Sequence, residues 1–226
     1  MKKTILILLT VTLIAAGCSG PDHNTLTDME KETGWELLFN GTTLEGWHGY
    51  LDDEVGAGWT VEDGLLVCKG KGGDIGGDIL TDEQYDNFIL SLEWNIAPGG
   101  NSGIFYHVIE DEKYSAPYAT GPEYQLIDDT GFESPLEEWQ KTGADYAMYP
   151  PNDKKEMNPA GDWNTSKIVF DHGKVEHWLN GKKIVEFEAW SDEWEERKKN
   201  GKWNKFPDYG TAENGRIGLQ DHGHVI

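Results

Sequence analysis

The sequence predicts an all-β protein built as a sandwich of two antiparallel sheets. Short alternating or β-rich runs recur along the chain between glycine-rich turns, and the chain holds 28 glycines. No stretch shows long helical periodicity. Many short strands separated by turn residues are typical of antiparallel sandwiches, so this class is expected for the whole folded region.

Nine strands are expected, and the clearest is the run 88–96, in which apolar and polar residues alternate strictly. Successive side chains of a strand point to opposite faces, which predicts a buried face and a polar face. The residues expected in the core are Phe88, Leu90, Leu92, Trp94 and Ile96. The other expected strands are 59–62, 65–69, 103–108, 123–128, 167–170, 175–180, 182–187 and 216–220. The turn Asn180-Gly181 predicts a hairpin between two of these strands.

A helix is predicted only at residues 192–199, after Ser191 as N-cap and before Asn200-Gly201 as its end. A helical turn is expected at 136–141. Residues 146–163 contain three prolines and predict a long ordered loop, the kind of segment that often builds a binding site.

Residues 1–17 are interpreted as a lipoprotein signal peptide. Two lysines precede an uncharged run, 4–16, that is too short to cross a bilayer. The run ends in Ala15-Ala16-Gly17-Cys18, which resembles a bacterial lipobox, so Cys18 is expected to carry lipid. An ordinary secretory signal cleaved nearby is the alternative. The expected location is the bacterial cell envelope, periplasmic or cell-surface, with membrane contact only through this N-terminal anchor.

The rest of the chain is predicted to be a flexible polar tether, 18–33, and one domain, 34–226. Nineteen basic and 41 acidic residues give a formal net charge of −22. Such a surface repels phosphate backbones and excludes nucleic acid as an expected partner, whereas a neutral ligand or a cation suits it. Cys68 is left without a partner and is expected to be a small buried apolar residue.

The most informative stretch is 121–128, which predicts a strand with Glu123 and Gln125 on one face and Tyr124 on the other. A carboxylate beside an amide suits a sugar ligand, although an ordinary solvated strand face is the alternative. Other polar groups occur in turns and strands elsewhere. They are Asn101, His107, Asp128, His177, Gln220, Asp221 and His222. Ten tryptophans include several in loops, such as Trp163, where an indole ring could stack on a sugar.

Taken together, these stretches resemble the 3-keto-disaccharide hydrolase family, from about Gly34 to the C-terminus. The segments that carry the resemblance are WELLFNGTTLEGW, WTVEDGLLVCKG, GGDILTDEQYDNFILSLEWNI, PGGNSGIFYHV, GPEYQLIDD, PAGDWNTSKIVF, VEHWLNGKKIVEF and GRIGLQDHG. The resemblance implies a concanavalin A-like jelly roll with the site on its concave face. Members of the family usually continue past the last segment with a further strand, and a chain that lacks it would have an open sheet edge.

The implied activity is hydrolysis of 3-keto-disaccharides or 3-keto-glucosides. A ketone at C3 acidifies the C2 hydrogen, so a base can form an enolate that expels the aglycone from C1 before water adds back. Glu123 or His177 is the expected base, with His222 or a divalent cation at the enolate. No ligand spacing identifies a cation site, and no cofactor is certain. Because Val175 and Leu179 share a face with His177, an inward-pointing histidine is an open alternative.

The expected substrate-binding residues are Asn101, His107, Tyr124, Gln125, Asp128, Trp163, Gln220 and Asp221. Three other functions stay open at this point, and one of them is a structural adhesion domain that binds no ligand. An ordinary glycosidase would pair Glu123 with Asp128 or Asp221 across the scissile bond. A non-catalytic carbohydrate-binding module would use the same fold without turnover.

Overall fold

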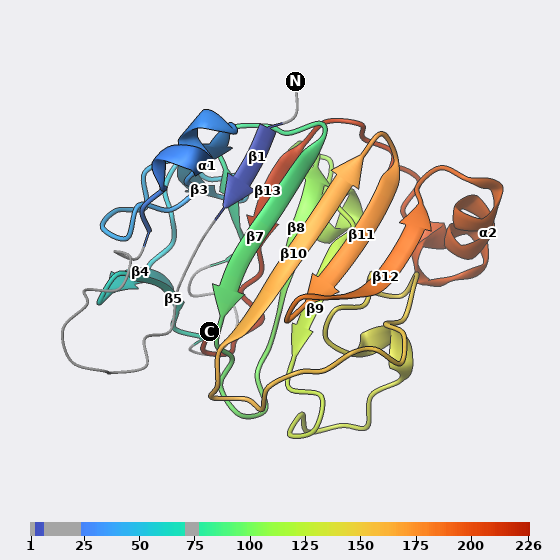
Figure 1. Cartoon of the computed structure of the whole chain (residues 1–226). Coiled ribbons are helices and arrows are strands. Elements are labelled where there is room, and N and C mark those ends of the chain that lie inside the picture. Colours follow the sequence, from blue (N-terminus) through green and yellow to red (C-terminus); the bar gives the residue numbers. More distant parts are fainter. Residues whose placement is uncertain (1–2, 7–23, 71–76) are drawn as a thin grey trace.

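The computed structural model describes residues 3–6, 24–70 and 77–226 and shows a jelly-roll sandwich of two sheets (Figure 1). Within these residues, sheet A has the strand order β12-β11-β10-β7-β1-β2 and sheet B has the order β3-β6-β13-β8-β9. A separate hairpin pairs β4 with β5. All pairings are antiparallel except those of β1, which runs parallel to β7 and β2.

The strands of sheet A are β1 (Lys3–Leu6), β2 (Trp35–Glu36), β7 (Phe88–Trp94), β10 (Asn164–Asp171), β11 (Lys174–Leu179) and β12 (Lys182–Glu188). Those of sheet B are β3 (Trp47–Gly49), β6 (Ile79–Thr81), β8 (Asn101–Val108), β9 (Glu123–Ile127) and β13 (Arg216–Leu219). The hairpin strands are β4 (Trp59–Glu62) and β5 (Leu65–Cys68). All nine predicted strands are therefore present. The short strands β2, β3 and β6 were not predicted.

The core lies between the two sheets and confirms the predicted register of β7. Phe88, Leu90, Leu92 and Trp94 are buried, and the residues between them are half-buried on the opposite face. Across the sandwich, the inward-facing side chains of β8 and β9 belong to the same apolar cluster as those of β7 and β10. The strand alternation read from the sequence therefore sets the packing of the two layers.

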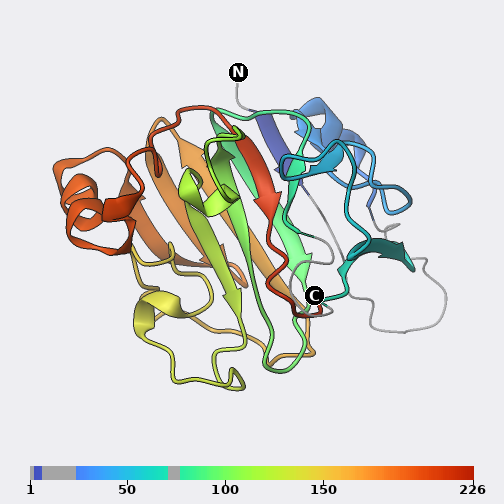
Figure 2. The ribbon, with the colours of Figure 1, turned by 180° about the vertical axis from the view of Figure 1, so that it is seen from behind.

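Sheet B is covered on both of its faces around β8 and β9, where every residue is buried. The two strands pair with Gly103 opposite Gln125 and Phe105 opposite Glu123. Figure 2 shows sheet B from the side opposite sheet A, with the yellow segment near residue 140 and the orange α2 region beside β9. These loop segments cover the outer face of the sheet, so polar residues there are removed from bulk water.

The helices that cover sheet B are α2 (Asp192–Asn200), with Ser191 as its N-cap, and three 3-10 turns. The turns are η1 (Pro117–Ala119), η2 (Glu138–Gln140) and η3 (Lys202–Lys205). The predicted helix and helical turn correspond to α2 and η2, and the segment 146–163 is a loop as expected. Lys198 Nζ donates to the carbonyl oxygens of Pro207 and Tyr209, at 2.8 Å each, and anchors η3 against α2.

The N-terminal region is more ordered than the tether interpretation implies. Thr27 and Glu30 form a capping box at the start of α1 (Asp28–Glu32), and the Asn24 amide donates to the Gly64 carbonyl at 2.8 Å. Residues 3–6, within the predicted signal segment, form β1. The lipidation site Cys18 lies outside the described residues. Across the described ranges, no helix is both long and apolar enough to cross a membrane. Cys68 is a buried free thiol, as expected.

The register of β7 generates a stability prediction. Leu90→Ala should lower the free energy of unfolding by about 2–5 kcal/mol, because it leaves a cavity between the sheets. Ser91→Ala, one residue along on the half-buried face, should change it by less than about 0.5 kcal/mol. Urea denaturation of both variants makes the measurement. Equal losses at the two positions would contradict the assigned faces.

Candidate active site

A cavity of about 520 Å³ opens on the outer face of sheet B. Polar residues of β8, β9 and the segment after β13 form its floor, and loop residues with η3 form its walls. Its lining residues are Asn101, Tyr118, Glu123, Gln125, Ile127, Phe132, Leu136, Gln140, Tyr146, Lys202, Trp203, Phe206, Gln220 and His222. A mostly aromatic wall around a few convergent polar groups, in a cavity of this size, is typical of small-molecule sites.

Glu123 lies on the floor of this cavity, and its side chain is almost completely buried. Its carboxylate has no hydrogen-bond partner within the described part of the chain. Burial raises the pKa of Glu123 to about 8, while the positive charge of Lys202 acts in the opposite direction and the charges of Asp78 and Asp145 raise it further. A carboxyl group with a pKa near neutrality is suited to take up and release protons at physiological pH.

Gly103, diagonally across from Glu123 on the paired strand β8, provides the space that the Glu123 carboxyl occupies. A Cβ atom at position 103 would lie 2.1 Å from Glu123 Oε1, well inside van der Waals contact. The φ angle of Gly103 is outside the left-handed region, so its backbone does not itself require glycine. The glycine is therefore needed for its lack of a side chain.

Three amide side chains lie beside Glu123 on the same floor. Gln125 Nε2 donates to Asn101 Oδ1 at 2.6 Å, which leaves Gln125 Oε1 and Asn101 Nδ2 free to meet a ligand. Gln220 is held in place through its backbone, because its carbonyl accepts from Ser102 Oγ at 2.7 Å and its amide donates to the Gly103 carbonyl. Donors and acceptors fixed in this way suit the hydroxyl groups of a sugar.

The wall of the cavity is aromatic and carries one lysine. Trp203 Nε1 donates to the Tyr146 carbonyl at 2.9 Å, which fixes η3 to the loop beside β9. Lys202 Nζ lies 4.2 Å from the centre of the Tyr146 ring and 4.7 Å from the Trp203 ring. His222 is exposed where the cavity opens to solvent.

The structure thus brings together five of the predicted site residues: Asn101, Glu123, Gln125, Gln220 and His222. It places the other six elsewhere. Glu123, Gln125 and one of the three candidate histidines, His222, line the same cavity.

His177 points into the core, the inward alternative that its neighbours on β11 allowed. It is fully buried, and its Nδ1 is 3.0 Å from the Gly143 carbonyl oxygen, so that nitrogen carries the proton. Burial lowers the pKa of His177 to about 4, against the opposite effect of this hydrogen bond, and the ring is neutral at pH 7. A base role in the cavity is therefore not supported for His177.

His177 belongs to a buried polar chain behind β9. Its Nε2 lies 3.4 Å from the Tyr106 hydroxyl, which also lies 3.2 Å from Asp145 Oδ1. Burial raises the pKa of Asp145 to about 8, although its hydrogen bond to Tyr106 acts to lower it. The Tyr106 hydroxyl donates to Asp145 and lies next to the acceptor nitrogen of His177, so it links the two titratable groups within the core.

His107 and Tyr124 also face away from the cavity. Both ring nitrogens of His107 lie near backbone carbonyl oxygens, those of Ala212 at 3.1 Å and Asp86 at 2.8 Å. The Tyr124 hydroxyl donates to the Trp178 carbonyl at 3.1 Å within the core. The strand alternation had placed Tyr124 on the face of β9 opposite to Glu123, and that face is the core. The position of Tyr124 therefore does not support contact with a substrate.

The two predicted aspartates have structural partners outside the cavity lining. Asp128 accepts from the backbone amides of Gly99 and Gly131, at 2.9 Å each, and holds the turns at one end of β8 and β9. Asp221 donates its backbone amide to Asp78 Oδ1 at 2.9 Å. Burial raises the pKa of Asp78 to about 7, against the effect of this hydrogen bond.

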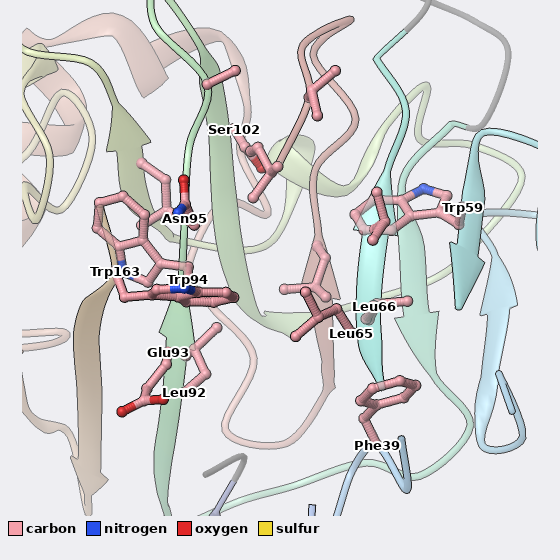
Figure 3. A pocket seen from close by; sticks show the side chains of 16 residues that line it. Phe39, Trp59, Leu65, Leu66, Leu92, Glu93, Trp94, Asn95, Ser102 and Trp163 are labelled. Carbon is pink, nitrogen blue, oxygen red and sulfur yellow. The ribbon is translucent and has the colours of Figure 1, made fainter. Parts of the chain in front are cut away.

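Trp163 lines a second cavity, of about 320 Å³, that is mainly apolar. Figure 3 shows Trp163 beside Trp94 on one side of this cavity, with Trp59 and Phe39 on the other side. The cavity lies between the end of β7 and the β4–β5 hairpin. Because Glu123 and its neighbouring amides do not line it, Trp163 is separated from the candidate active site.

The donor atoms of the candidate active site fit a divalent cation poorly. Among the lining residues, Glu123 supplies the one carboxylate and His222 the one imidazole. The neighbouring polar side chains on the floor are neutral amides. Across the described ranges, no three His, Cys, Asp or Glu side chains gather as metal ligands. Calcium and magnesium sites normally draw on several carboxylate or carbonyl oxygens. A divalent cation at the enolate therefore stays a prediction from the sequence.

Sequence reasoning missed most of the wall of the site: Tyr118, Gln140, Tyr146, Lys202 and Phe206. Tyr118 lies shortly before β9, and the others come from loops and 3-10 turns after it, with Lys202 and Phe206 the most distant in sequence. One signal was available, because the stretch Lys202-Trp203 places a cation beside a large aromatic residue in a chain that is otherwise strongly acidic. Aromatic residues and a cation in one loop are common features of ligand sites.

Comparison with known proteins identifies the family. Residues 34–226 match the family model described as a 3-keto-alpha-glucoside-1,2-lyase-like domain. The chain is 33% identical over 226 residues to the 3-keto-disaccharide hydrolase of Bacteroides thetaiotaomicron, an alignment that covers 85% of this chain and 75% of the relative. The chain belongs to this family, and the resemblance seen in its sequence is confirmed.

Two solved structures support the same fold. Both come from Parabacteroides distasonis and are provisionally named glycosyl hydrolases. The first is 46% identical, with a TM-score of 0.83 over 89% of this chain and 94% of the other. The second is 27% identical, with a TM-score of 0.60 over 81% and 88% of the two chains.

The raised pKa values near 8 generate a stability prediction. Between about pH 5 and pH 8 the folded protein keeps protons on Asp145 and Glu123 that the unfolded chain has already lost, so the free energy of unfolding should fall as pH rises through this range and level off above it. Asp145→Asn removes one of these groups and should flatten the slope. Glu45→Gln, at an exposed position, should leave the slope unchanged. Urea denaturation at several pH values tests this, and identical slopes for all three proteins would refute it.

Proposed function

We propose that this protein cleaves glycosides that carry a ketone at C3, by elimination of the C1 aglycone with Glu123 as the base. The observation that carries the proposal is one buried carboxyl group, with its pKa raised to about 8, on the floor of a cavity otherwise lined by amides and aromatic rings. A base with such a pKa is matched to proton abstraction near neutral pH.

The substrate's own chemistry makes one base sufficient. The C3 carbonyl acidifies the hydrogen on C2, and the electrons of the broken C2–H bond pass into an enolate. The enolate re-forms the carbonyl as it expels the oxygen at C1, which gives an enone and a free aglycone. Addition of water to C1 of the enone completes a net hydrolysis.

The carboxylates of the site favour this route over ordinary glycoside hydrolysis. An ordinary glycosidase uses two carboxyl groups that face the scissile bond. Here Asp128 is committed to its turn and Asp221 does not line the cavity, so neither is placed to pair with Glu123. Asp78 is the competing partner, because its charge influences Glu123, although it too lies outside the lining.

The other residues of the cavity have roles that follow from their chemistry. Asn101, Gln125 and Gln220 offer donors and acceptors to the hydroxyl groups of the sugar. The rings of Tyr146, Trp203 and the neighbouring wall residues offer flat faces to the C–H side of the sugar ring. His222, at the opening, is the candidate to protonate the departing aglycone oxygen.

The comparisons support this proposal. The matching family is described as 3-keto-alpha-glucoside-1,2-lyase-like, and the proposed elimination acts across C1 and C2, where the C1–O bond breaks and a C1–C2 double bond forms. The relative from Bacteroides thetaiotaomicron is named for hydrolysis of 3-keto-disaccharides. We also propose, from residues 1–18 alone, that the protein acts as a lipoprotein of the cell envelope.

Loss of the C2 hydrogen should be visible in the product. If the reaction is run in heavy water, the sugar released from a 3-keto glycoside should carry deuterium at C2, beyond the exchange of a free keto-sugar control. Glu123→Gln should lower turnover roughly 100-fold or more, because general base catalysis typically contributes about 10²–10⁴. Mass spectrometry of the products measures both effects.

Matched controls separate this proposal from its competitors. Glu45→Gln should keep full turnover, and circular dichroism should show that Glu123→Gln remains folded. Comparable cleavage of the unoxidised parent glycoside without deuterium at C2 would instead indicate two-carboxylate chemistry. Sugar binding without turnover of either substrate would indicate a carbohydrate-binding module.

The pH dependence of turnover should report the ionisation of Glu123. A base must be unprotonated, so kcat/KM for a 3-keto glycoside should rise roughly tenfold per pH unit below its pKa and level off above about pH 8. Initial rates at low substrate concentration, in buffers from about pH 5.5 to 9, measure the profile. A profile that levels off near the ordinary glutamate pKa would show that Glu123 is not the base.

A further inference from the structure

The cavity contains a lysine for which the mechanism above has no role. Lys202 lies on η3, directly after α2, and its side chain extends along the aromatic wall. Its Nζ approaches the ring centres of Tyr146 and Trp203 at 4.2 and 4.7 Å. Lys202 forms no ion pair with any described residue. Its charge is therefore held in place without being neutralised.

Two neighbouring lysines show what is particular about Lys202. The ammonium group of Lys198 is fully used, because it donates to two backbone carbonyls that anchor η3. Lys202 and Lys205 are both exposed on η3, but Lys205 does not line the cavity. Lys202 alone of the three faces the candidate active site, and its contacts are the faces of aromatic rings, which attract a cation but accept no proton.

Lys202 and Glu123 each affect the pKa of the other across the cavity. Burial lowers the pKa of the Lys202 amine, and the carboxylate of Glu123 acts to raise it. The lysine acts in return to lower the pKa of Glu123. No salt bridge joins the two groups, and both line the same cavity, so a ligand bound there can contact the carboxyl group and the ammonium group. This arrangement suits a reaction in which a proton leaves toward one side and negative charge develops toward the other.

We propose that Lys202 is the electrophilic catalytic residue of the site, and that its ammonium group binds the C3 oxygen and stabilises the enolate formed when Glu123 removes the C2 proton. This inference rests on the proposed function. It gives Lys202 the role of stabilising the enolate, for which the sequence predicted His222 or a divalent cation.

The proposed step balances without a further reactant. The C2–H electron pair forms the C2–C3 double bond, and the carbonyl π pair moves to O3 beside Lys202. When the carbonyl re-forms, the C1–O bond breaks and the C1–C2 double bond forms. The aglycone oxygen takes up one proton, which equals the proton that Glu123 received. Lys202 keeps its ammonium form throughout.

Variants at Lys202 test the inference. Lys202→Met removes the charge and keeps an apolar chain on the wall, and it should lower kcat for a 3-keto glycoside by about 10²–10³, the usual effect of losing one oxyanion donor. The rate of deuterium incorporation at C2 should fall by the same factor. Lys202→Arg keeps a cation and should recover part of the loss. Lys205→Met, on the same turn, should retain full activity.

Binding of the unoxidised parent glycoside, followed by tryptophan fluorescence, should be little affected by Lys202→Met because that ligand has no ketone. Wild-type-like turnover and C2 exchange by a folded Lys202→Met protein would overturn the role of Lys202 and leave the proposed function standing. If the wild-type protein neither turns over the 3-keto substrate nor exchanges C2, the proposed function itself fails.

Borohydride trapping distinguishes a covalent role. An adduct of the 3-keto sugar on Lys202, found by peptide mass spectrometry, would show that the amine forms an imine and would overturn the electrostatic role. Absence of an adduct during active turnover, together with the kinetic loss in Lys202→Met, supports the ammonium group as the enolate partner.

Discussion

The covering of β8 and β9 on both faces is the constraint on which the candidate active site depends. One face of these strands packs against sheet A, and the other lies beneath loops and η3. A polar side chain on the outer face is therefore held in a medium that solvates charge poorly. On a solvated sheet the same glutamate would ionise normally. The amides there would exchange their hydrogen-bond partners with water. Beneath the loops they become a proton-accepting group and a fixed set of hydrogen-bonding atoms.

The floor of the site is formed by paired strands, and its walls are formed by loops and η3. The floor belongs to paired strands of the sandwich, whose register is determined by the core. The walls come from long connections. The contacts that position them include the hydrogen bonds of Lys198 to the carbonyls of Pro207 and Tyr209, the bond from Trp203 to the Tyr146 carbonyl, and backbone hydrogen bonds between residues 143–146 and β9. This division is common in enzymes, because loops can vary while the scaffold keeps its geometry. In this protein it places Glu123 on the sheet and Lys202 on the wall.

The sequence predicted the features that follow from strict alternation of apolar and polar residues along a strand, and few others. Strict period-two patterns gave the buried face of β7 and the shared face of Glu123 and Gln125. Strands of two or three residues, such as β2 and β6, are too short to show a period and were missed. His177 illustrates a polar residue on a core face, where its neighbours Val175 and Leu179 were the better guide. Lys202 and the aromatic wall depend on how distant loops fold over the sheet, and no local pattern in a single sequence records that.

The contact between Gly103 and Glu123 also has an evolutionary consequence. Position 103 admits a side chain only when the carboxyl opposite is shortened or moved, since the two would occupy the same volume. The effect of a substitution at one position therefore depends on the residue at the other, which is epistasis imposed by sterics rather than by backbone conformation. A lineage that gave up the glutamate would lose the selection for glycine on the neighbouring strand. Members of the family that have left this chemistry should then be recognisable by a paired change at these two positions.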